Sequence, residues 1–71
     1  MIIYKKNVLE LRKELKKIGY TLKTEKLNEN KVFINIYLNK IWVYGSDANV
    51  YHKDTIKEHN QAIQIVRKYV I

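Results

Sequence analysis

Residues 31 to 38, Lys-Val-Phe-Ile-Asn-Ile-Tyr-Leu, alternate between two kinds of side chain without a break. A period of two predicts a β-strand, because an amphipathic helix repeats about every 3.6 residues. One face of this strand is aliphatic, and the other carries Phe33, Asn35 and Tyr37. Any fold of the chain therefore has to place the first face on a core. The aliphatic positions are Val32, Ile34, Ile36 and Leu38.

Two turns extend this strand into an antiparallel sheet. Asn39-Lys40 fits a two-residue hairpin loop, since Asn tolerates positive φ, and Ile41 to Tyr44 forms the next strand, ending at Gly45. Asn28 to Asn30 is a second turn signal, and Tyr20 to Leu27 forms the strand before it. Tyr20, Leu22 and Thr24 are expected to join Ile41 and Val43 on the aliphatic face. The predicted hairpin pairs are Leu38 with Ile41, Tyr37 with Trp42, Ile36 with Val43 and Asn35 with Tyr44.

Helical periodicity appears on both sides of the strands. From Asn7 to Ile18 the apolar residues recur at intervals of three and four, Asn7 is a credible N-cap, and Gly19 predicts a left-handed stop. The apolar stripe of this helix is Val8, Leu11, Leu15 and Ile18. A second helix is expected to begin at Asp54, after an irregular segment with a short extended piece at Val50-Tyr51. Its stripe is Ile56, His59, Ile63, Val66 and Val70, with Ala62 and Tyr69 on the flank.

These elements predict a two-layer α+β fold in the order helix, strand, strand, strand, helix. The sheet has three antiparallel strands, and Ile2 to Tyr4 can add a short edge strand at the front. The chain has 71 residues, no proline, two glycines and nothing that resembles a linker, so we expect a single domain over 1–71. Cysteine is absent, which excludes disulfides and thiolate metal sites. No signal peptide or apolar run near the roughly 20 residues of a membrane span is visible, so a cytoplasmic protein is expected.

The second face of the predicted sheet is rich in aromatic residues. If both helices cover the aliphatic face, four rings lie uncovered on the other, and such a patch usually marks a binding surface. The rings are Phe33, Tyr37, Trp42 and Tyr44, with Lys40 close by in the loop. A ring face stacks on a nucleobase for about 1–3 kcal/mol while neighbouring lysines hold phosphates. Two other arrangements bury the rings: one helix on each face, or two sheets meeting in a homodimer.

The predicted first helix carries a basic side opposite its Leu11–Leu15 stripe. The net charge of the chain is +7, which attracts anionic partners. The cations are Arg12, Lys13, Lys16 and Lys17, joined by Lys5 and Lys6 if the helix begins early. They can neutralise several phosphates along a groove. The alternative is an ordinary solvated face, balanced by pairs such as Glu10 with Lys13 and Glu14 with Lys17.

No enzymatic motif is present. His52 lies in the predicted loop and His59 on the apolar side of the second helix, where a packed ring is expected, and neither has a ligand partner at the spacing that zinc requires. A Gly-rich phosphate loop is also absent. We therefore expect no catalytic residues, no metal and no cofactor.

The order of elements resembles that of double-stranded RNA-binding domains and of HicA-type toxin ribonucleases. The first family opens its second helix with a Lys-Lys cluster, where this chain reads Asp54-Thr55-Ile56-Lys57. The second family has a Gly-Ser-His run entering its second strand, where this chain reads Glu29-Asn30-Lys31. The resemblance is thus one of order, and neither family is assigned.

The sequence predicts a non-enzymatic nucleic-acid-binding module, for DNA or RNA. The alternative is a small inhibitor or adaptor, of the kind that phages and other mobile elements encode, which binds a host nucleic-acid-processing protein. The same surface would serve in either case, and no membrane partner is expected. The predicted binding residues are Lys5, Lys6, Arg12, Lys13, Lys16, Lys17, Phe33, Tyr37, Lys40, Trp42 and Tyr44.

Overall fold

The computed structural model describes residues 1–45 and 57–71 and confirms the α+β class. Helix, strands and helix follow one another as predicted, and the optional N-terminal strand is present. The elements are β1 (Ile2–Tyr4), the 3-10 turn η1 (Lys5–Asn7), α1 (Val8–Lys16), β2 (Tyr20–Lys26), β3 (Lys31–Leu38), β4 (Ile41–Gly45) and α3 (Asn60–Arg67). The predictions for Val50, Tyr51, His52, Asp54 and Ile56 lie outside the described residues.

β3 is the central strand of the four-stranded antiparallel sheet. β2 pairs with one of its edges in a register that sets Leu22 opposite Ile36, so Leu22 lies on the aliphatic face as predicted. β1 and β4 divide the other edge between them, β1 opposite the first half of β3 and β4 opposite the second. β2 is consequently an edge strand, since among the described elements it pairs with β3 alone.

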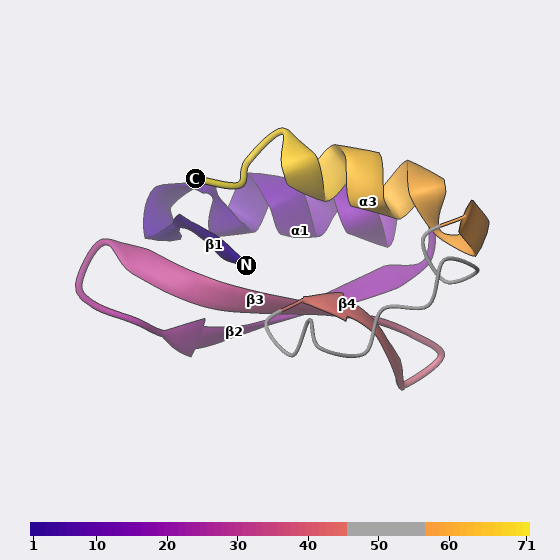
Figure 1. The fold of residues 1–71 in the computed structure, drawn as a ribbon, viewed down its shortest axis with the longest axis horizontal. Coiled ribbons are helices and arrows are strands. Elements are labelled where there is room, and N and C mark those ends of the chain that lie inside the picture. The colour runs from indigo at the N-terminus through magenta and orange to yellow at the C-terminus, as the bar shows by residue number, and fades with distance from the viewer. Residues whose placement is uncertain (46–56) are drawn as a thin grey trace.

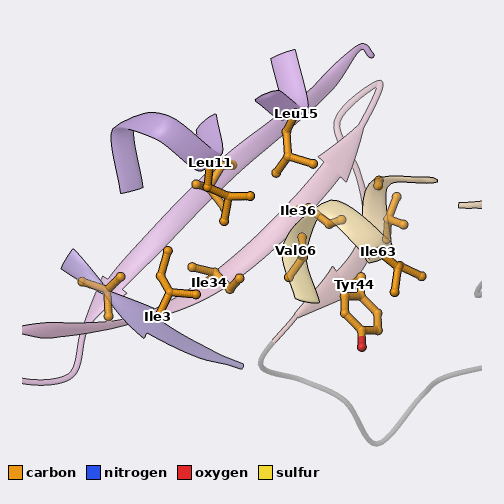
Figure 2. Packing of buried hydrophobic residues seen from close by; sticks show 12 residues of the cluster. Ile3, Leu11, Leu15, Ile34, Ile36, Tyr44, Ile63 and Val66 are labelled. Carbon is orange, nitrogen blue, oxygen red and sulfur yellow. The ribbon is translucent and has the colours of Figure 1, made fainter. Parts of the chain in front are cut away.

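Both described helices lie on the same face of this sheet (Figure 1). The arrangement with one helix on each face is thereby ruled out for α1 and α3. Between the two layers, the buried side chains form one apolar cluster with no buried polar residue among those described (Figure 2). Its members are Ile3, Leu11, Leu15, Leu22, Val32, Ile34, Ile36, Val43, Tyr44, Ala62, Ile63 and Val66. The apolar stripes of both helices thus pack on the aliphatic face, as predicted.

Tyr44 does not lie on the aromatic face, and the prediction for this residue is wrong. The β3–β4 register shifts after Tyr37 opposes Trp42, so that Ile36 opposes Tyr44 and not Val43. An extra residue in one strand reverses the alternation beyond it. The Tyr44 side chain therefore points into the core, where it is 4% exposed, on the same side of the sheet as the labelled core residues of α3 (Figure 2).

The hairpin loop itself is confirmed. Asn39 and Lys40 both have positive φ, 51° and 68°, which is the signature of the type I′ turn that matches the twist of a hairpin. Ile41 opposes Leu38 as predicted, but it is 70% exposed and does not belong to the core. The reason is that the tip of the hairpin bends away from the helix layer (Figure 1).

The first helix is shorter than predicted and begins through a 3-10 turn. Asn7 occupies the N-cap position of α1, but its side chain makes no capping hydrogen bond, so the cap interaction predicted there is absent. Gly19 follows the helix with φ +89° and confirms the left-handed stop. At the other end of the chain, Val70 forms a bridge with Ile3, which ties the C-terminal residues to β1.

Candidate functional site

Glu14 of α1 is bound to the C-terminal end of α3. Lys68 Nζ lies 2.9 Å from Glu14 Oε1, and the Tyr69 hydroxyl donates a 2.6 Å hydrogen bond to Glu14 Oε2. The ion pair of Glu14 is thus with Lys68 and not with Lys17, which was predicted from helical spacing and contributes only a weaker coulombic effect. The two contacts hold the pKa of Glu14 below its ordinary value, first through the Tyr69 hydrogen bond and then through Lys68. The same hydrogen bond raises the pKa of Tyr69.

The cations of α1 and its C-cap residue Lys17 make no ion pair with the Glu14 carboxylate. Arg12, Lys13, Lys16 and Lys17 are all exposed, and within residues 1–45 and 57–71 none of them forms an ion pair. Helical geometry directs Arg12 and Lys16 toward β2, away from α3. Arg12 confirms this direction, because its Nη2 donates a 3.4 Å hydrogen bond to the backbone oxygen of Leu22. The structure therefore places Arg12 and Lys16 on the β2 side of α1 and Glu14 on its α3 side.

Lys5 and Lys6 precede α1 in η1, and both are exposed. The Lys5 backbone N–H donates a 2.8 Å hydrogen bond to the oxygen of Asn30, which ties η1 to the β2–β3 turn. The two lysines border a hollow of about 530 Å³ together with Tyr4, Glu29 and Asn30. They extend the basic surface toward this end of the sheet.

Three of the four predicted rings share the sheet face that neither described helix covers. Phe33, Tyr37 and Trp42 are half-buried there. Trp42 Nε1 donates a 3.0 Å hydrogen bond to Asn35 Oδ1, which fixes the indole on that face. Lys40 lies close by, as predicted, and lines a small hollow of about 280 Å³ with Thr21, Lys23 and Tyr37.

Two residues of this face are missing from the predicted site. Lys23 Nζ lies 4.9 Å from the centre of the Tyr37 ring, a cation–π contact. Alternation already indicated the face of Lys23, because Leu22 and Thr24 on either side of it were expected on the aliphatic face. In the structure Thr21 opposes Tyr37, and Lys23 is the diagonal neighbour of Tyr37. Tyr4 joins the same face through β1, where Ile2 opposes Phe33. Its position depends on the pairing of Tyr4 with Lys31, 27 residues away in the sequence, which local patterns do not determine.

The His59 ring packs against Tyr20, in agreement with the packed ring predicted for it. The Tyr20 hydroxyl and His59 Nδ1 are 2.7 Å apart, and the two rings meet edge to face with centroids separated by 5.7 Å. Burial raises the pKa of Tyr20. Over the part of the chain that the structure describes, no group of three acidic, His or Cys side chains could hold a metal ion. No helix in that part is long and apolar enough to cross a membrane.

No protein-family model matches the chain, and no curated protein or solved structure matches it either. The function is therefore argued from the geometry of the described residues.

Proposed function

We propose that the protein is a non-enzymatic nucleic-acid-binding module. The observation that carries the proposal is the separation of charge on α1. Glu14 accepts hydrogen bonds from Lys68 and Tyr69, and among the described residues none of the exposed cations Arg12, Lys13, Lys16 and Lys17 forms an ion pair with it. The field of these cations adds to that of a chain with net charge +7.

The side chains of the aromatic sheet face are also suited to a nucleic acid. Tyr37 and Phe33 are aromatic residues on a face where Lys23 and Lys40 supply positive charge. Aromatic stacking is tolerant of base identity, and lysine contacts to phosphate carry no sequence information. Recognition by such a surface is expected to depend strongly on salt and weakly on sequence.

The experiment is a titration of labelled single-stranded and duplex oligonucleotides at two salt concentrations, read by fluorescence anisotropy. The logarithm of the binding constant should fall with the logarithm of salt by about 0.9 per phosphate neutralised on duplex and about 0.7 on single strands. The double variant Lys13→Gln, Lys17→Gln should bind more weakly and with a shallower slope. The matched control is Lys57→Gln, Arg67→Gln, which removes the same charge from exposed positions on the α3 side. Binding that is absent at low salt, or that salt does not affect, would refute the proposal.

The second candidate is an inhibitor or adaptor that docks on a nucleic-acid-processing protein. The observation that favours it is the outer edge of β2. Leu27 N–H bonds to Lys31 O, so odd residues of β2 face β3, while the backbone groups of Tyr20, Leu22, Thr24 and Lys26 point outward. Such an edge can accept an added strand from a partner. Recovery of one stoichiometric protein in a pull-down after nuclease treatment, from wild type and not from a Thr24→Pro variant, would favour this function.

A further inference from the structure

The basic side of α1 and the aromatic sheet face meet at a single strand. Arg12 reaches the oxygen of Leu22 from the helix layer. The next residue, Lys23, points to the opposite face, where its ammonium group lies 4.9 Å from the centre of the Tyr37 ring. Because β2 is the edge of the sheet, no further described strand separates these two positions. Positive charge therefore continues from one layer to the other around the edge of β2.

We infer that the ligand is a single-stranded nucleic acid whose backbone crosses this edge, with phosphates at Arg12, Lys16 and Lys23 and one base stacked on Tyr37. The inference rests on the proposed function and specifies its ligand. A strand bound in this way contacts both the basic side of α1 and the aromatic sheet face, so the two surfaces form one binding path.

The stiffness of a duplex is the first reason for a single strand. Duplex DNA has a persistence length of about 50 nm, so it cannot turn around an edge that is one strand wide. A duplex that contacts the cations of α1 consequently leaves Lys23 and Lys40 unused. A single strand is flexible enough to follow both layers.

The access of bases is the second reason. Bases in a duplex are stacked on each other, and their faces are unavailable to a protein ring unless they are unstacked, which costs free energy. The hollow at Tyr37 is small, about 280 Å³, and it is bordered by Lys23 and Lys40. Such a hollow suits one unpaired base with a lysine on either side for its phosphates.

Lys23 covers the Tyr37 ring in the unbound protein and has to move when a base stacks there. Lys23 is exposed, and a cation–π contact of an exposed ammonium group is weak. Stacking of a base on an aromatic ring is stronger, and the displaced ammonium group gains a phosphate. The exchange is therefore favourable.

The test compares a labelled single-stranded oligonucleotide of about 12 nucleotides, within the usual site size of such modules, with the blunt duplex of the same sequence. Tyr37→Leu should weaken single-strand binding by roughly 5- to 150-fold and leave duplex binding unchanged. Tyr37→Phe should retain single-strand affinity, because it keeps the ring. Lys23→Gln should weaken single-strand binding more than the control Lys57→Gln does.

The outcomes distinguish the path across β2 from the proposed function. If single strands bind through the α1 cations but Tyr37→Leu and Lys23→Gln bind like wild type, or if the duplex binds more tightly, the path across β2 is refuted and the proposed function stands. If neither oligonucleotide binds, both are refuted. A fold check by circular dichroism accompanies each variant, and Tyr37→Phe supplies the comparison if Tyr37→Leu does not fold.

Discussion

The Tyr69 hydroxyl donates a 2.6 Å hydrogen bond to Oε2 of Glu14, which joins the C-terminal end of α3 to the middle of α1 across 55 residues of sequence. The same carboxylate accepts a hydrogen bond from Lys68. The contact stabilises the packing of the two helices, and it gives Glu14 partners other than the cations of α1.

This contact predicts a loss of stability in acid. The pKa of Glu14 in the folded protein lies below its ordinary value of 4.5, so the ionised form contributes stability above that value, and the contribution disappears as pH falls through the lowered pKa. Glu14→Gln should therefore be less stable than wild type near neutral pH, and the difference should shrink toward the acid end. Urea unfolding at a series of pH values measures this. Glu29→Gln, an exposed carboxylate in the β2–β3 turn, is the control and should not change the profile.

Two tyrosines of the hairpin should respond differently to truncation. Tyr44 is 4% exposed in the core, so Tyr44→Ala should cost about 3–5 kcal/mol, as large-to-small core substitutions do. Tyr37 is half-buried on the other face, and Tyr37→Ala should cost about 1 kcal/mol or less. Urea midpoints of the two variants provide the comparison. Equal losses would contradict the bulge that turns Tyr44 inward.

The hairpin loop predicts a stabilising substitution. Lys40 has φ 68°, in the left-handed region that favours glycine. Lys40→Gly should raise the free energy of unfolding by about 0.5–1 kcal/mol, because Asn-Gly suits both central positions of a type I′ turn. Lys40→Ala removes the same charge but keeps the strain, so it should give no gain in thermal denaturation. A gain of equal size in both variants would assign the effect to the charge.

A side chain at position 45 should have the opposite effect and lower the stability of the fold. The φ of Gly45 is +150°, and a Cβ at this position would lie 2.4 Å from the oxygen of Ile34 and 2.7 Å from the Cα of Asn35. Backbone cannot move aside as a flexible side chain can, so Gly45→Ala should cost about 1–3 kcal/mol. Gly19→Ala is the informative comparison, since its Cβ would meet only Leu38 Cδ1, at 3.9 Å, and the cost there comes from φ alone. Thermal unfolding of both variants should rank Gly45→Ala as the more damaging.

Part of the candidate site followed from sequence patterns. The turn at Asn28 to Asn30 and the alternation before it placed Leu22 on the aliphatic face, and the structure agrees, with Leu22 opposite Ile36. Alternation along β3 placed Phe33 and Tyr37 on the face opposite the aliphatic one, and the structure decided that both described helices cover the aliphatic face. The position of Tyr44 could not be obtained in this way, because no local signal before Gly45 marks the residue at which the bulge is inserted.

The sequence by itself determined the elements, the two faces of β3 and the side of α1 that carries its cations, because each depends on a periodicity within a few residues. The tertiary structure decided which partner neutralises Glu14, which face receives Tyr44 and how the basic helix meets the aromatic sheet face at Lys23. Those relationships depend on how α3, β4 and α1 pack on β3. Such packing joins residues far apart in the chain, and no short pattern encodes it.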